Sequence, residues 1–373
     1  MLTGRVSVGH PVDIATGIVY STYEDISIPG KVALTWERLY TTAILDMPLT
    51  PLGPGWTNRY FSTLKYDEDK KEFQFFAPEG YIEVFADPDG KIEQGETIRN
   101  LGTFQELYKR EDRYIITQWG VETGEVERYV FKEGRKGEVW LLASIEDVTG
   151  QGLDMLRDST GRLTGIQQRL EKRTLVIEYT VNNQVKAVSF LMPDNQRQVL
   201  VRYEYHNHGI LATAYDALGY ADRYEYDDNS CMTREVAKDG GIFYFKYDEI
   251  GRCIKASGLD RYDEKSLRYL DYNRMTEVTN SLGYMTRYQW NENGQVVCEI
   301  DPRGGTKRTE YDEYGRIISR TKPDGSITRY EYDEYGNRCK IMKPLDRISL
   351  ITFNENHQPV VMTDPSGNVW LRE

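Results

Sequence analysis

The stretch Tyr311-Asp312-Glu313-Tyr314-Gly315-Arg316-Ile317 returns 21 residues later as Tyr332-Asp333-Glu334-Tyr335-Gly336-Asn337-Arg338. Its first residue, which we call the anchor, recurs every 21 or 22 residues through the C-terminal half of the chain. The anchors are Tyr205, Tyr226, Tyr247, Tyr269, Trp290, Tyr311, Tyr332 and Phe353, and two weaker copies precede them at Arg157 and Tyr179. A fixed period of this length predicts a repeat protein, in which each unit buries its apolar face by stacking on its neighbours.

Each repeat contains two turn signals. Four residues after the anchor, eight of ten copies have Gly or Asn, which best tolerate a positive φ, so we expect the left-handed conformation there. These residues are Gly161, Asn183, Gly209, Gly251, Asn273, Gly294, Gly315 and Gly336. An Asp or Asn directly follows most anchors, and Asp first with Gly fourth is typical of a type I turn. A second turn signal, such as Pro323-Asp324-Gly325, lies half a repeat later, which leaves two strands per repeat.

The segments between the turns have the composition of half-buried strands. Residues 326–332 and 307–311 alternate between polar and apolar side chains and are rich in Thr, Tyr and Ile. Helix signals are almost absent. We therefore predict an all-β fold, a long strip with about two strands per 21-residue repeat, polar on one face and apolar on the other. Curling the strip around itself would cover the apolar face.

The composition restricts the class of function. The chain has 373 residues, and its 28 Tyr, 6 Trp and 11 Phe suit sheets that carry half-exposed amphipathic rings. A net charge of −12 argues against nucleic acid or an anionic membrane as the main partner and mildly favours a basic protein. No apolar stretch has the length of a signal-peptide core or of a membrane span, so export would need a dedicated system or an upstream segment.

A different pattern occupies the front of the chain. It contains Gly9-His10-Pro11-Val12-Asp13-Ile14-Ala15-Thr16-Gly17, then Trp36-Glu37-Arg38-Leu39-Tyr40, and then Pro51-Leu52-Gly53-Pro54-Gly55-Trp56. These motifs indicate short strands with Gly and Pro corners. We expect three parts: an N-terminal segment over residues 1–64, a β-meander over residues 65–150, and about ten repeats over residues 151–373.

Together these motifs resemble the N-terminal part of bacterial Rhs (rearrangement hotspot) proteins. Their Tyr-Asp (YD) repeats also occur in the C component of insecticidal toxin complexes and in teneurins. The resemblance covers essentially the whole chain. It implies a β-strip that spirals into an open part of a hollow shell, which encapsulates a C-terminal toxin of the same polypeptide for interbacterial competition.

The same resemblance implies partners and a location. The partners would be the downstream Rhs core and toxin segment, and the spike proteins of a type VI secretion system. The protein would reside in the bacterial cytoplasm before export, without a signal peptide. No enzymatic activity, cofactor or metal is implied for this part of the polypeptide.

The chain also departs from the family pattern. It lacks an upstream spike-tip domain and the downstream core with the DPxG segment, at which an aspartate-dependent cleavage releases the toxin. It stops at Glu373, one residue before the next anchor is due. We therefore expect part of a longer array, with either self-association through its last repeats or fraying after about Pro344.

Candidate catalytic groups fit structural roles better than chemical ones. His206 and His208 could share a strand face, but no Cys or carboxylate recurs nearby at ligand spacing. Carboxylate pairs such as Asp312 and Glu313 recur from repeat to repeat, whereas a catalytic pair is needed once. Asp364 begins a DPxG-like sequence but occupies an ordinary turn position. The cysteines Cys231, Cys253, Cys298 and Cys339 stand at four different repeat offsets, which favours free thiols.

Two other functions are compatible with the sequence. Exposed rows of Tyr that alternate with charges could stack on sugar rings, which would make the chain a carbohydrate-binding or cell-surface-binding module. The chain could also be a truncated remnant without independent activity. A regular column of Tyr is, however, also what a stacked sheet needs for its own packing, so we favour the shell.

Overall fold

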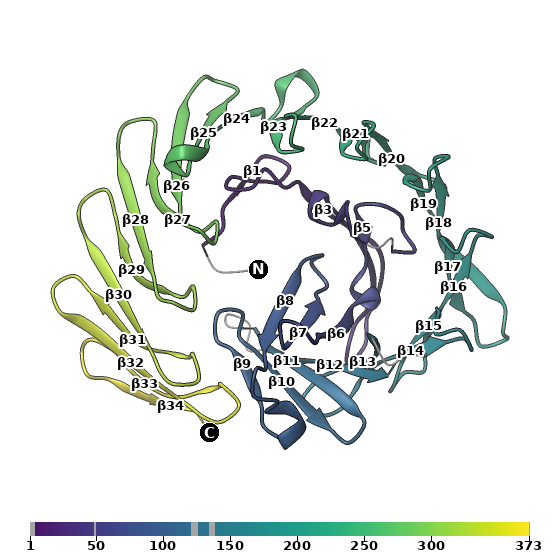
Figure 1. The fold of residues 1–373 in the computed structure, drawn as a ribbon, viewed down its shortest axis with the longest axis horizontal. Helices are drawn as coiled ribbons and strands as arrows, with labels where there is room; N and C mark the ends of the chain where they lie inside the picture. The colour runs from purple at the N-terminus through teal and green to yellow at the C-terminus, as the bar shows by residue number, and fades with distance from the viewer. Residues whose placement is uncertain (1–3, 48–49, 121–125, 134–138, 373) are drawn as a thin grey trace.

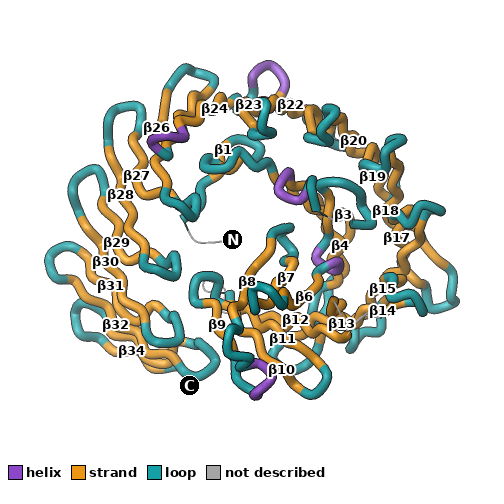
Figure 2. The backbone as a smooth tube through the Cα atoms, viewed as in Figure 1, coloured by secondary structure: helices purple, strands orange, loops and turns teal. Residues whose placement is uncertain are grey.

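The computed structural model describes residues 4–47, 50–120, 126–133 and 139–372. The turns expected at residues 122–124 and 136–137, and Glu373, lie outside the described residues. Strands dominate the fold, with only short 3₁₀ helices between them in the described parts (Figure 2). These helices are η1 (Thr42–Ile44), η2 (Arg59–Phe61), η3 (Ile92–Gln94), η4 (Leu259–Arg261) and η5 (Asp271–Asn273). The prediction of an all-β fold is confirmed.

The N-terminal residues form two small antiparallel sheets. The first pairs β1 (Ser7–Val8) with β2 (Val12–Asp13), and the second has the order β3 (Tyr20–Ile28), β4 (Leu34–Thr41), β5 (Trp56–Thr57). In β4 the side chains of Leu34, Trp36, Arg38 and Tyr40 are all completely buried. The N-terminal strands therefore present a continuous buried face to the rest of the molecule.

The meander follows and closes part of the large sheet on itself. Its strands are β6 (Thr63–Asp67), β7 (Glu72–Phe76), β8 (Ile82–Ala86), β9 (Ile98–Asn100), β10 (Gln105–Arg110), β11 (Arg113–Trp119), β12 (Val126–Glu133) and β13 (Val139–Glu146). β13 has three partners, because β12 pairs along most of it while β6 and β14 (Gly152–Arg157) pair with its two ends. This branching makes the sheet a closed barrel at the meander, which the repeat period did not predict.

The repeats continue from β14 as one antiparallel ladder, in which each strand pairs with the one before it. The first strands are β15 (Leu163–Gln168), β16 (Thr174–Tyr179), β17 (Val185–Leu191), β18 (Arg197–Tyr205), β19 (Leu211–Asp216), β20 (Ala221–Tyr226), β21 (Met232–Val236), β22 (Ile242–Tyr247), β23 (Cys253–Gly258) and β24 (Lys265–Leu270). The later ones are β25 (Met275–Asn280), β26 (Met285–Trp290), β27 (Val296–Ile300), β28 (Thr306–Tyr311), β29 (Ile317–Thr321), β30 (Ile327–Tyr332), β31 (Arg338–Lys343), β32 (Arg347–Phe353), β33 (Pro359–Thr363) and β34 (Val369–Leu371).

The strip of repeats curls into a ring, and the N-terminal strands lie inside the curve (Figure 1). The far end of the strip comes back toward β9 and β10. The largest completely buried side chains come mostly from the inner strands and include Trp36, Trp56 and Arg38. The core therefore includes the layer between the strip and the segment that it surrounds, and it continues into the meander. Within the described residues, no helix has the length and apolar character needed to cross a membrane.

Candidate functional site: the inner face of the strip

The turn after each anchor is fixed by the side chain that follows the anchor. At Asp312, the Oδ1 atom accepts the backbone N–H groups of Tyr314 at 3.0 Å and Arg316 at 2.9 Å. The Gly315 N–H donates to the Asp312 carbonyl, and the ladder shifts register just before Tyr311. This is a type I turn closed by a left-handed residue and a bulge. The same bonds recur at Asp158, Asp227, Asp248, Asn291, Asp333 and Asn354.

The fourth position of these turns is left-handed in all described repeats but one. Gly161, Gly209, Gly251, Gly294, Gly315 and Gly336 have φ between 72° and 90°, and Asn183 has φ of 63°. Asn273 was expected to follow this rule, and that expectation is wrong. Its repeat contains the 3₁₀ helix η5, so Arg274, one residue later, takes the left-handed conformation with φ of 46°.

The anchor tyrosines tie each repeat to the one before it. The Tyr226 hydroxyl donates to the Leu211 carbonyl at 2.7 Å, and the Tyr332 hydroxyl donates to the Ile317 carbonyl at 2.8 Å. Each acceptor lies six residues after the preceding anchor. The same bond is made by Tyr205, Tyr247, Tyr269 and Tyr311. Trp290 donates instead to the Thr276 hydroxyl at 3.3 Å. Phe353 has no donor on its ring, so its repeat cannot form this link.

The arginine that follows the turn glycine adds a second link between repeats. The Arg252 guanidinium lies 4.4 Å from the ring centroid of the next anchor, Tyr269, and Arg316 lies 4.4 Å from that of Tyr332. Arg316 is also held by its own turn, because its Nε atom lies 2.7 Å from Asp312 Oδ2. This cation–π role was missed from the sequence, although the recurrence of Arg after Gly was visible there.

Residues 4–62, which we call the lining segment, pack against the inner face of the strip. The Trp36 indole donates to the Tyr203 hydroxyl at 2.8 Å. Tyr203 and its equivalents Tyr224 and Phe245 each stand two residues before an anchor and are 2–4% exposed. These positions therefore point into the ring, where Trp36 on β4 and Trp56 on β5 lie against the two tyrosines and His10 lies 6.0 Å from the Phe245 ring.

Arg38 is the most deeply placed charge in this layer. Its side chain is completely buried and forms two hydrogen bonds with Asp25, at 2.6 and 2.9 Å. It also lies 3.2 Å from Asp222 Oδ2 and donates to the Tyr224 hydroxyl at 2.9 Å. Asp25 belongs to the lining segment, whereas Asp222 and Tyr224 belong to β20. The guanidinium therefore connects the two layers, and its removal would leave buried carboxylates uncompensated.

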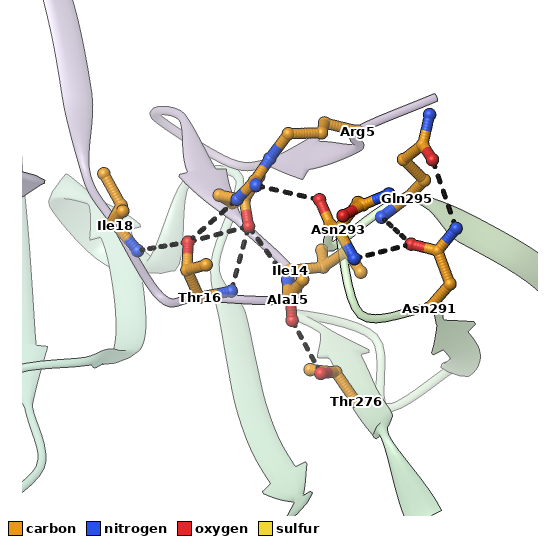
Figure 3. A network of polar contacts seen from close by, with 10 residues as sticks. Arg5, Ile14, Ala15, Thr16, Ile18, Thr276, Asn291, Asn293 and Gln295 are labelled. Carbon is orange, nitrogen blue, oxygen red and sulfur yellow. Dashed lines mark hydrogen bonds and ion pairs between the residues drawn. The ribbon is translucent and has the colours of Figure 1, made fainter. Parts of the chain in front are cut away.

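A clip near the N-terminus holds the lining segment to the later repeats (Figure 3). Arg5 pairs with Asp13 at 2.8 Å and donates to the Asn293 carbonyl at 3.3 Å, while Thr276 donates to the Ile14 carbonyl at 2.6 Å. Main-chain hydrogen bonds also join the strip to the lining segment. The N–H groups of Val185, Cys253 and Val296 donate to the carbonyls of Pro51, Gly17 and Gly4. The carbonyls of these three donor residues also accept anchor hydroxyls.

The described part of the lining segment reaches as far as the β27–β28 repeat. Gly4 lies against the Tyr311 ring, with no room there for a Cβ atom. Beyond it, a groove of about 510 Å³ is lined by Gly4, Tyr311, Ile317, Tyr330 and neighbouring side chains. Among the described residues after Ser319, only Gly336 and Asn337 are buried. The inner face of the last repeats is thus accessible at positions that the lining segment covers elsewhere.

A second cavity, of about 1000 Å³, lies between the meander and the first repeats. Its lining is mainly apolar and includes Phe61, Phe76, Leu141 and Leu163, with Arg157 as a half-buried cation. The described residues around it include no His, Cys or carboxylate. The cavity therefore offers no acid–base pair or thiolate nucleophile among these residues.

The candidate chemical groups of the sequence are dispersed. His206 bonds the Tyr224 carbonyl at 3.2 Å, His208 is exposed, and His10 stacks on Phe243 at 3.9 Å. No cluster of metal-binding side chains occurs in the described parts of the chain. All four cysteines are free. The histidines are therefore not gathered into one site.

The carboxylates mainly serve the turns. The Thr160 hydroxyl and turn amides lower the pKa of Asp158 to about 2, and a hydrogen bond from Asn368 lowers the pKa of Asp364. Asp364 accepts the N–H groups of Ser366 and Asn368, as the other turn carboxylates do. Burial on β8 raises the pKa of Glu83 to about 7, but Glu83 faces the meander core. Asp158 and Asp364 therefore stabilise their turns.

Three family models match the chain. A teneurin YD-shell model matches residues 120–242, an RHS repeat model matches residues 311–342, and a domain of unknown function, DUF6531, matches residues 9–85. The DUF6531 match falls on the lining segment and the first meander strands. The other two fall on the end of the meander, the first repeats and two of the regular later repeats. Two of the three descriptions name the repeat architecture directly.

Curated relatives include two proteins with different chemistry. A probable deoxyribonuclease, RhsB of Dickeya dadantii, is 24% identical over 320 residues, which cover 79% of this chain and 21% of the relative. A double-stranded DNA deaminase toxin of Burkholderia cenocepacia is 27% identical over 239 residues, which cover 61% of this chain and 15% of the relative. The chain thus spans about a fifth or less of the length of these relatives.

Solved structures with a similar course of the chain come from toxin complexes. The crystal structure of TcdB2-TccC3 without its hypervariable C-terminal region has a TM-score of 0.46 at 10% identity, covering 93% of this chain and 24% of that one. The Photorhabdus luminescens Tc holotoxin pore has a TM-score of 0.43 at 12% identity, covering 80% and 19%. The matching repeat models and Rhs relatives, together with the regular anchor–turn array, support an Rhs/YD-repeat shell protein.

Proposed function

We propose that this chain is a section of the wall of a hollow β shell, which holds another polypeptide segment against its inner face and has no enzymatic activity of its own. One observation carries the proposal. The inner face of β28 to β34 repeats the positions that the lining segment covers on β18 to β26, yet it leaves them accessible. A second polypeptide could occupy these positions as the lining segment occupies the earlier ones.

The names of the relatives support a carrier role. One is named for DNA hydrolysis and another for DNA deamination, and the chain is similar to a small part of each. A segment common to proteins with two different reactions is expected to supply neither reaction. The held segment would then be the toxin part of the same polypeptide. In this proposal the protein is made in the bacterial cytoplasm. A dedicated secretion system exports it with its spike proteins, and the toxin acts in interbacterial competition.

Protease protection would test the proposal. The full chain is co-expressed with the polypeptide encoded directly downstream, and the resistance of that polypeptide to added protease is measured. We expect protection in the wild type and its loss in Tyr330→Glu, which places a charge on the accessible inner face. Arg329→Glu is the matched control, because Arg329 is the exposed neighbour on the same strand. Equal protection with both variants, or none with the wild type, would contradict the shell.

Exposed tyrosines on the turns favour one alternative, a carbohydrate-binding surface. Tyr262, Tyr272 and Tyr284 are 70%, 101% and 59% exposed, so their rings are available for stacking on sugars. Binding to a glycan array that is lost in a Tyr272→Ala, Tyr284→Ala double variant would favour this alternative. Absence of glycan binding, together with protection of a downstream segment, would favour the shell.

A further inference from the structure

Among the described residues, the far end of the strip contacts the meander through its last anchor turns. His357, in the last anchor turn, lies 4.4 Å from the Trp119 ring and 6.2 Å from the Phe104 ring, measured between centroids. Arg99 on β9 lies 5.1 Å from the Tyr335 ring centroid. The only buried residues after Ser319 in the described chain, Gly336 and Asn337, belong to this contact. The ring of Figure 1 is therefore closed here by side chains from its two ends.

His357 breaks the rule of its own repeat. It stands at the fourth position of the turn, where six other copies have glycine, and it adopts the left-handed conformation with φ of 59°. Histidine adopts that conformation more often than most non-glycine residues, but it is uncommon for any of them. Phe104, on the opposite side of the contact, is also left-handed, with φ of 58°. Two left-handed non-glycine residues therefore meet where the ring closes, and the strain at the bulky Phe104 persists only where the surrounding structure holds it.

The neighbours of His357 determine which of its ring nitrogens carries the proton. Its Nδ1 atom lies 2.7 Å from Asn337 Oδ1, and the Asn337 amide nitrogen donates to Asp333 Oδ2 at 2.9 Å. With the Asn337 oxygen turned toward the ring, Nδ1 carries the proton, so Nε2 is the atom that would accept a second one. The charged groups around the contact are Arg99 on β9, Glu106 on β10, and Asp333 and Arg316 from the preceding turns.

We propose that His357 is an acid-released latch, which holds the last repeats against the β9–β11 edge while it is neutral and lets the ring open when it is protonated. The latch is independent of what the shell holds. Burial against the aromatic rings, helped by Arg99 and opposed by Glu106 and Asp333, lowers the pKa of His357 in the closed ring. In the open ring the imidazole returns to its ordinary pKa of about 6.5. Neutral His357 therefore contributes fully to closure above its ordinary pKa of about 6.5, and this contribution is lost as the pH falls below that value.

Amide hydrogen exchange of the full chain tests the latch. Exchange is measured at about pH 7.5 and about pH 5.5, with correction for the intrinsic pH dependence of exchange. We expect amides of residues 334–358 and 98–106 to exchange faster at the lower pH, by at most about tenfold, because the open-state imidazole with its pKa of about 6.5 sets that limit one pH unit lower. Amides of β18 to β25 should show no such change, because they lie far from the contact.

Two variants separate the latch from a general loss of structure. His357→Asn keeps a residue that tolerates the left-handed conformation but cannot titrate, so the pH step should disappear. Trp119→Ala removes the opposing ring and should expose residues 334–358 at both pH values. His208→Asn, in an earlier turn without such a contact, should behave as the wild type. A pH step that persists in His357→Asn, or unchanged protection in Trp119→Ala, would overturn the proposal.

Discussion

The repeats of the strip lie in two different environments, one with the lining segment on the inner face and one without it. On β18 to β26 the lining segment covers the inner face, and Tyr203, Tyr224 and Phe245 are 2–4% exposed. On β28 to β34 the anchor turns are the same and Tyr311 and Tyr332 form the same hydroxyl bonds, but only Gly336 and Asn337 are buried among the described residues after Ser319. The repeat therefore determines the hairpins by itself, while a second polypeptide layer supplies the deep burial.

This difference predicts uneven stability. In a repeat array each unit is stabilised by its own contacts and by those with its neighbours, so local free energies of opening can differ widely. The lined region adds a layer of aromatic rings and a buried ionic network. The unlined region depends on anchor hydrogen bonds, arginine stacking and the ladder itself. Variants placed at equivalent positions in the two regions can measure the contribution of the lining.

The largest effect is expected from Arg38→Met. The substitution leaves Asp25 and Asp222 buried without their cation, which should cost about 3–5 kcal/mol of unfolding free energy. Urea denaturation followed by tryptophan fluorescence would measure the loss. Arg320→Met is the matched control in the unlined region, because Arg320 is exposed, and it should change stability by less than about 0.5 kcal/mol. Similar losses for both variants would remove the energetic contrast between the regions.

Removing an anchor hydroxyl should also cost more unfolding free energy in the lined region than in the unlined region. Tyr226 donates to Leu211 and accepts from the Trp56 indole at 2.9 Å, so Tyr226→Phe leaves two buried groups without a partner and should cost about 1–3 kcal/mol. Tyr332 donates to Ile317 and is half-buried, so Tyr332→Phe should cost about 0.5–1.5 kcal/mol. Denaturant melts of the two variants provide the comparison. An equal cost would show that the lining adds nothing at the anchors.

Turn glycines should respond equally in both regions, because their strain is local. Gly251 has φ of 82° and open space where a Cβ atom would lie, and Gly315 has φ of 79°. Gly251→Val and Gly315→Val should each cost about 1–2 kcal/mol. Glu313→Gln, at an exposed turn position, is the control and should melt as the wild type does. Equal melting temperatures for all four proteins would contradict the role of positive φ.

The sequence predicted what is local and missed what is distant. The turns were predictable because their hydrogen bonds join residues two to four positions apart, and the period revealed them. The Arg38 network and the β6–β13 pairing join residues far apart in the chain, so no periodic signal could indicate them. Asn273 was predicted wrongly because the 3₁₀ helix η5 in its turn shifts the left-handed position to Arg274. His357 was visible as an exception to the glycine rule, but its partner Trp119 was not.

The smallest effect on stability is expected at the last strand. Val369, Trp370 and Leu371 on β34 are 57%, 52% and 76% exposed, an apolar strand surface that favours self-association. Trp370→Lys should shift the protein toward monomer in sedimentation velocity, while the unfolding free energy changes by less than about 0.5 kcal/mol. Ser366→Lys adds the same charge in the adjacent exposed turn and should leave association unchanged.

Hydrogen exchange at the same strand sharpens the comparison between the two regions. Amides of residues 350–371 should be weakly protected in the monomer, because no second layer covers their strands, and they should gain protection when a downstream segment is added. A strictly monomeric wild type with these amides already protected would show that the unlined repeats are stable without a second layer. The two regions would then differ in the burial of their inner faces but not in local stability.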